Sequence, residues 1–137
     1  QDVIALQPKI VVILAGTNDI AGNTPLKDLE TVAGHIFSMA ELAHAQGIKV
    51  ILCSVIPAAD YPWRSGKSPE KKIPKLNSMI QDYCSENNFY YLDYFSAMTD
   101  GKNGLIENYG YDGVHPNEKG YLVMTKAVEK AINDLLD

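Results

Sequence analysis

The sequence predicts an α/β domain in which helices cover both faces of a parallel sheet. Residues 9–15 and 49–55 form apolar runs rich in β-branched side chains, as expected of strands buried on both faces. A shorter run of this kind covers residues 89–92, and segments with helical periodicity separate the three runs. Alternation of strands and helices along the chain is typical of right-handed crossovers in a parallel sheet.

The length and composition are those of one globular domain spanning residues 1–137. Hydrophobic residues make up 46% of the chain and charged residues 21%. The formal net charge of −5 argues against a nucleic-acid partner, which would need a clustered basic surface. No run of about 18 apolar residues is present, so we expect no membrane span. No signal-peptide pattern is present either, but a mature or truncated chain would look the same, so the compartment is undetermined.

The first predicted strand, residues 9–15, follows the end of a helix at residues 3–6. That helix should stop there because a residue preceding a proline, here Pro8, avoids helical backbone angles. The second strand, residues 49–55, contains Cys53. Cys53 and the helical Cys84 are interpreted as buried thiols rather than a disulfide, and their spacing suits no metal site.

A helix is predicted between the first two strands. Thr24 is a suitable N-cap, Pro25 suits the first helical position, and Asp28 falls in the first turn. Gly47 provides a stop at the other end. One stripe of this helix is apolar and predicts the buried face: Leu29, Val32, Ala33, Ile36, Met39, Ala40 and Ala43.

The second half of the chain continues the alternation. Residues 58–72 are rich in proline and predict a long functional loop rather than a linker. A helix over residues 74–87, the strand at 89–92 and a last helix over residues 117–136 complete the pattern.

Three polar segments fall at one edge of the predicted sheet. Residues 16–19 follow the first strand, residues 57–64 follow the second, and residues 112–115 precede the last helix. Ligands of open parallel sheets bind beyond the carboxyl ends of the strands. We therefore expect the functional site at this edge.

Asp112 and His115 form the first candidate pair. Gly113 permits a turn that folds the carboxylate back onto the imidazole, where an ionised Asp fixes the tautomer and stabilises the imidazolium. The alternative is a helix-entry turn in which Asp112 only caps backbone amides and His115 is exposed. The three-residue spacing does not separate the two interpretations.

Asn18 is the second candidate. An Asn that leaves a strand through Gly16 can direct its side-chain amide toward a developing oxyanion, a role in which such donors are worth about 10²–10³ in turnover. The alternative is an Asx-turn, in which the side chain binds its own backbone.

Taken together, these motifs resemble the SGNH hydrolases, also called the GDSL esterase/lipase family. Residues 16–19 (Gly-Thr-Asn-Asp) and 112–116 (Asp-Gly-Val-His-Pro) are similar to blocks three and five of that family. Residues 54–57 (Ser-Val-Ile-Pro) and 61–64 (Tyr-Pro-Trp-Arg) resemble the members that cleave sugar and acetyl esters. The resemblance covers essentially the whole chain in order.

The resemblance implies a flavodoxin-like three-layer α/β/α sandwich and a Ser-His-Asp triad that uses no metal and no cofactor. It also implies hydrolysis of small acyl esters. By this resemblance, Asn18 is an oxyanion donor, His115 the general base and Asp112 its orienting carboxylate. Gly16 and Asp19 then shape the binding loop.

Trp63 and Arg64 are further candidate binding residues. The Trp ring can stack on a sugar, and the guanidinium can bind its hydroxyls or a carboxylate. The alternative is a Trp that only packs the loop against the domain.

Two blocks of the family pattern, the one with the nucleophile and the one with an oxyanion glycine, have no counterpart. The family nucleophile lies in Gly-Asp-Ser, and no serine of this chain follows Gly-Asp. We interpret the chain as the carboxyl-terminal portion of a longer enzyme that lacks two amino-terminal strands. The strand at residues 9–15 would then be an exposed edge, which predicts self-association or a missing amino-terminal fragment.

The leading hypothesis is thus an SGNH-type serine esterase that cleaves small acyl esters, acetyl esters of carbohydrate in particular, with the serine outside this chain. A rival is a catalytically inactive carbohydrate-binding module that uses Trp63. A nucleotide- or phosphate-binding domain is disfavoured, because residues 16–19 contain one glycine, no lysine and a carboxylate.

Overall fold

The fold is a parallel three-stranded sheet between two layers of helices. The computed structural model describes residues 8–16, 28–59 and 69–136. Its strands are β1 (Ile10–Ile13), β2 (Lys49–Cys53) and β3 (Tyr90–Leu92), in the order β1-β2-β3. Val11 pairs with Val50, and Leu52 pairs with Tyr91, both in parallel register. The predicted parallel sheet is confirmed.

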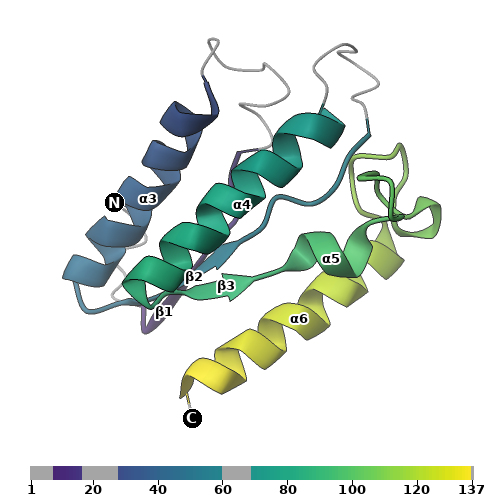
Figure 1. Cartoon of the computed structure of the whole chain (residues 1–137). Coiled ribbons are helices and arrows are strands. Elements are labelled where there is room, and N and C mark those ends of the chain that lie inside the picture. Colours follow the sequence, from purple (N-terminus) through teal and green to yellow (C-terminus); the bar gives the residue numbers. More distant parts are fainter. Residues whose placement is uncertain (1–7, 17–27, 60–68, 137) are drawn as a thin grey trace.

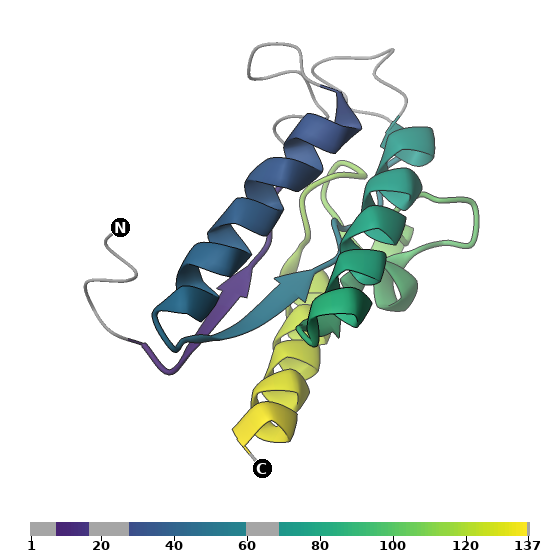
Figure 2. The ribbon, with the colours of Figure 1, turned by 60° about the vertical axis from the view of Figure 1, so that its left-hand side comes forward.

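Helices cover both faces of the sheet. Figures 1 and 2 show α3 (Leu29–Ala45) and α4 (Pro69–Asn87) on one face, and α5 (Tyr94–Met98) and α6 (Glu118–Leu136) on the other. Each face has its own hydrophobic cluster, because neighbouring side chains of a strand point in opposite directions. On β2, Leu52 packs toward α3 and α4, while Ile51 packs toward α5 and α6. The predicted α/β/α sandwich is confirmed.

The start of α3 differs from the prediction. Asp28 has extended backbone angles, φ −76° and ψ 165°, and its side chain accepts a hydrogen bond from the Thr31 amide at 2.7 Å. Asp28 is therefore the N-cap, so the expectation of Thr24 as N-cap and Asp28 in the first turn was wrong. A carboxylate is a better cap than a threonine hydroxyl. Thr24, Pro25 and the helix end predicted at residues 3–6 lie outside the described residues.

Other boundaries of helices and strands also differ from the prediction. The helix α4 begins at Pro69 and carries Pro74 inside it, whereas the sequence predicted a start at Pro74. Burial of Pro69 and Ile73 accounts for the additional turn. The ladder of β1 ends at Ile13, two residues before the predicted end. The short α5 and a 3₁₀ turn, η1 (Glu107–Tyr109), were not predicted.

One side of β1 is uncovered by the described helices. Val12 and Leu14 are 38% and 43% exposed. They lie on the same face as Ile10, which packs toward α5 and α6, because strand residues two apart share a face. The helix α6 packs against β3 and α5 instead. No helix in the described part of the chain is long and apolar enough to span a bilayer.

The chain leaves β2 inside the core. The amide of Ser54 still donates to the Leu92 carbonyl, so Val55 is the first residue beyond the ladder. Val55 is fully buried, and Asn77 of α4 satisfies both of its backbone groups. Asn77 Oδ1 accepts from the Val55 amide at 2.7 Å, and Asn77 Nδ2 donates to the Val55 carbonyl at 3.0 Å. The Asn77–Val55 pair thereby fixes where the segment after β2 begins.

Replacing Asn77 with leucine should destabilise the fold. The variant Asn77→Leu leaves the amide and the carbonyl of Val55 buried without partners, at roughly 1–3 kcal/mol for each group. We expect a lower midpoint in urea unfolding, with the slope unchanged. The exposed Gln81→Leu on the same helix is the matched control and should shift stability by about 0.5 kcal/mol or less. Equal losses in both variants would contradict the assignment.

Candidate active site

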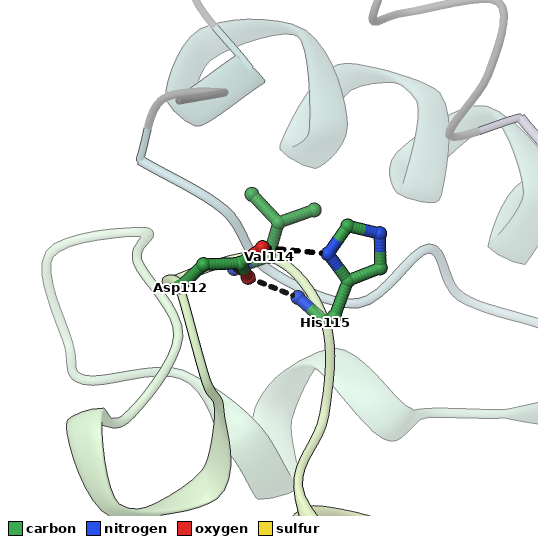
Figure 3. A network of polar contacts seen from close by, with 3 residues as sticks. All are labelled: Asp112, Val114 and His115. Carbon is green, nitrogen blue, oxygen red and sulfur yellow. Dashed lines mark hydrogen bonds and ion pairs between the residues drawn. The ribbon is translucent and has the colours of Figure 1, made fainter. Parts of the chain in front are cut away.

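Asp112 and His115 meet as the sequence predicted. The His115 ring atom Nδ1 lies 2.7 Å from Asp112 Oδ2, and Figure 3 shows the two groups facing each other across the turn. The other carboxylate oxygen, Oδ1, accepts from the amides of Val114 at 2.9 Å and of His115 at 2.8 Å. Gly113 has φ +82°, the left-handed angle that the turn requires. Asp112 therefore caps backbone amides and also holds the imidazole, so the two sequence interpretations are combined.

Hydrogen bonds and packing hold the Asp112–His115 turn in place on both sides. The Tyr111 amide donates to the His115 carbonyl at 3.0 Å, which closes the turn across its base. Val114 is buried in the cluster of α3 and α4. The chain then enters α6 through Asn117, whose side chain caps the Gly120 amide at 3.0 Å. The orientation of His115 thus depends on packing as well as on the hydrogen bond to its ring.

The environment of Asp112 favours its ionised form. Its pKa is lowered from 3.8 to about 2, chiefly by the hydrogen bond from the His115 amide, with further contributions from the imidazole and the Val114 amide. The His115 side chain is 62% exposed and that of Asp112 is 36% exposed. An ionised carboxylate at Nδ1 leaves Nε2 of the exposed ring as the proton acceptor. The pair can therefore serve as a general base with its orienting group.

Gly16 lies where the first strand leads into the second candidate motif. Its φ is +114°, and a Cβ there would lie 3.0 Å from Leu76 and 3.3 Å from Val55. A larger residue at this position would be both strained and crowded. Val114 shares a hydrophobic cluster with Val55 and Leu76. The same hydrophobic cluster therefore packs against both the Asp112–His115 turn and Gly16.

Four predicted site residues cannot be placed. Asn18 and Asp19 follow Gly16, and Trp63 and Arg64 belong to the loop after β2; all four lie outside the described residues. Their roles stay predictions.

Ser54 is not available as a nucleophile. It is fully buried, and its Oγ accepts from the Phe95 amide at 2.8 Å and lies 3.5 Å from Asp93 Oδ1. Burial also raises the pKa of the Cys53 thiol to about 12 and that of Cys84 to about 11, so neither thiol is ionised near neutral pH. Among the described residues no group of three His, Cys, Asp or Glu is arranged to hold a metal ion.

Asn77 is the positioning residue that sequence reasoning missed. It fixes Val55, whose side chain borders Gly16. The signal was present: Asn77 lies on the apolar stripe of its helix, one turn after Ile73 and one turn before Ile80. A polar residue on a buried stripe indicates a backbone group that needs a partner.

The stability contributed by Asp112 should depend on pH. Because its folded pKa is lowered, the contribution is complete above the ordinary value of 3.8 and is lost as the pH falls toward 2. The loss of Tm caused by Asp112→Ala should therefore be larger at about pH 6 than at about pH 3. The exposed Asp82→Ala serves as control. A Tm loss that is the same at both pH values would contradict this assignment.

Known proteins share this fold. A GDSL-like lipase from Bacteroides thetaiotaomicron is 43% identical, and its crystal structure matches with a TM-score of 0.94 over 98% of this chain and 66% of that one. An acetylxylan esterase from Xylanibacter ruminicola is 26% identical over 151 residues, which cover 96% of this chain and 30% of the relative. The chain therefore spans less than two thirds of the length of these relatives.

A more distant structure supports the fold alone. A catalytic mutant of an acetylxylan esterase from Geobacillus stearothermophilus is 20% identical, with a TM-score of 0.73 over 95% of this chain and 62% of that one. The model of the GDSL-like lipase/acylhydrolase family matches residues 1–123. With most of its length matched by that model, the chain belongs to the GDSL-like lipase/acylhydrolase family.

Proposed function

We propose that this chain is part of a serine esterase in which His115 is the general base and Asp112 holds it. The 2.7 Å contact between His115 Nδ1 and Asp112 Oδ2 carries the proposal. An exposed imidazole whose Nδ1 faces an ionised carboxylate is suited to taking a proton from an attacking hydroxyl through its Nε2. Membership of an acylhydrolase family supports the same assignment.

The nucleophilic serine comes from a segment outside this sequence. No serine of the chain follows Gly-Asp, and Ser54 is buried. The serine attacks the acyl carbon, His115 Nε2 accepts its proton and passes it to the departing alcohol, and an acyl-serine remains. Water, deprotonated by the same imidazole, then releases the acid and restores the serine. Asn18 donates to the oxyanion, and Gly16 and Asp19 shape the loop that presents it.

The substrate proposed is a small acyl ester, acetyl in particular, on a carbohydrate. One relative, from Xylanibacter ruminicola, is an acetylxylan esterase, which supports this choice. Trp63 and Arg64 are proposed to bind the sugar. A carbohydrate-binding module without catalysis is the rival function, and it differs in needing neither the serine nor His115.

The test supplies the missing segment. The part of the Bacteroides lipase that this chain does not match is fused to residues 1–137, and hydrolysis of p-nitrophenyl acetate is measured. We expect little or no turnover from the chain alone and clear turnover from the fusion. In the fusion, Asp112→Asn should lower kcat by about 10⁴-fold and Asn18→Ala by about 10²–10³-fold.

His44→Ala is the matched control, because His44 is an exposed histidine of α3. It should leave kcat unchanged, whereas His115→Ala should abolish turnover. A folded fusion without activity would contradict the proposed function and favour the binding module. Turnover that survives His115→Ala would contradict the assigned base.

We also propose that the uncovered side of β1 mediates self-association when no further segment covers it. Val12 and Leu14 are exposed apolar residues near β1, which is the edge strand of the described sheet. Sedimentation velocity should show concentration-dependent oligomers, and Val12→Lys should weaken association by roughly tenfold or more, because a charge would be buried. Met39→Lys, at an exposed apolar site on α3, is the control. A monomer at every concentration would rule out this contact.

A further inference from the structure

A polar hollow lies beside the Asp112–His115 turn, between η1 and the start of α6. It is a wide depression, largely open to solvent, with a volume of about 690 Å³. The side chains that bear on its chemistry are those of Glu107, Asn108, Tyr111, Glu118 and Lys119. The assigned pair of the active site is not among its lining residues.

The backbone around the polar hollow is held in place. Asn117 Nδ2 donates to the Asn108 carbonyl at 2.8 Å, and the Asn117 amide donates to the Tyr109 carbonyl at 2.8 Å. Gly120 packs so closely on the Tyr109 carbonyl that a side chain there would collide with it. These contacts tie η1 to α6, so the walls of the hollow have a fixed separation. A preformed site loses less entropy on binding than a mobile one.

Four of the side chains that line the hollow make no polar contact within the described part of the fold. Within the described part of the chain, the side chains of Glu107, Tyr111, Glu118 and Lys119 make no hydrogen bond or ion pair. Tyr111 is 75% exposed, which leaves most of its ring to solvent. The hollow therefore combines a flat apolar surface with hydrogen-bond acceptors and donors that are free to bind a ligand.

The charges favour a neutral ligand. Glu107 and Glu118 contribute two carboxylates against the one ammonium of Lys119, and the ionised Asp112 follows Tyr111 directly. An anionic ligand would meet net negative charge here. A neutral polyol can form hydrogen bonds with all three charged groups, because its hydroxyls donate to carboxylates and accept from the ammonium. The C–H face of a sugar ring is also apolar enough to lie on a tyrosine ring.

The position links the hollow to the reaction. Tyr111 precedes Asp112, and its amide binds the His115 carbonyl at 3.0 Å, so the hollow adjoins the turn that carries the imidazole. We propose that the polar hollow is a subsite for unmodified sugar units of a neutral oligosaccharide, next to the unit whose ester is cleaved. Its catalytic relevance rests on the proposed esterase function, whereas the binding itself does not.

The test measures binding without turnover. Xylohexaose is titrated into the ¹⁵N-labelled chain, and amide shifts are followed by NMR. We expect saturable shifts at residues 107–111 and 117–119, and roughly tenfold weaker binding by Tyr111→Ala. The control is Tyr121→Ala, because Tyr121 is a 56% exposed tyrosine of α6 that does not line the hollow, and its binding should equal that of the wild type.

A second variant tests the charge argument. Hexagalacturonate, an anionic oligosaccharide, should bind more weakly than xylohexaose, and Glu118→Gln should narrow that difference. Absence of xylohexaose binding, or binding that is unchanged in Tyr111→Ala, would overturn the inference. The two proposals fail separately: a fusion that hydrolyses p-nitrophenyl acetate while the chain binds no oligosaccharide rejects the subsite alone. Binding without any esterase activity rejects the proposed function alone.

Discussion

The two backbone groups of Val55 impose the constraint on which the edge of this sheet depends. A strand that ends inside a core exposes an amide and a carbonyl where water cannot reach them, and both need partners. Asn77 supplies both partners from α4 with one side chain. With Val55 held, Gly16 has a surface to pack against, and Val114 joins the same cluster. One buried amide thus connects the ends of two strands with the turn that carries the histidine.

The Asp112–His115 turn shows how a short motif becomes a fixed geometry. A carboxylate that bound only the imidazole would be free to rotate about its own side chain. Here its second oxygen is held by two backbone amides of the same turn, so the position of the carboxylate is set by the backbone itself. The same bonds keep Asp112 ionised, which couples orientation to charge.

Much of the fold was predictable because its signals are local. The β-branched runs at β1 and β2 and the glycine stop after α3 are visible within a few residues, and the structure has all of them. The start of α3 was not, because Thr24 and Asp28 are both acceptable caps and the preference for Asp over Thr is too small to fix the boundary from sequence. The turn at Asp112 was predictable as a pair, whereas the hydrogen bonds of Ser54 and Asn77 join segments far apart in sequence.

The strand order β1-β2-β3 follows the order of synthesis. Among the described residues, β2 pairs with β1 and β3 pairs with β2, and a helix, α3 or α4, lies between the members of each pair. Pairing therefore brings together only strands that follow one another in the sequence, so the entropic cost of closing each connecting segment is low. As the chain emerges from the ribosome, β2 and β3 can each pair with a strand that has already been synthesised. Assembly in this order leaves the outer edge of β1 as the unpaired part of the described sheet from the first pairing onward.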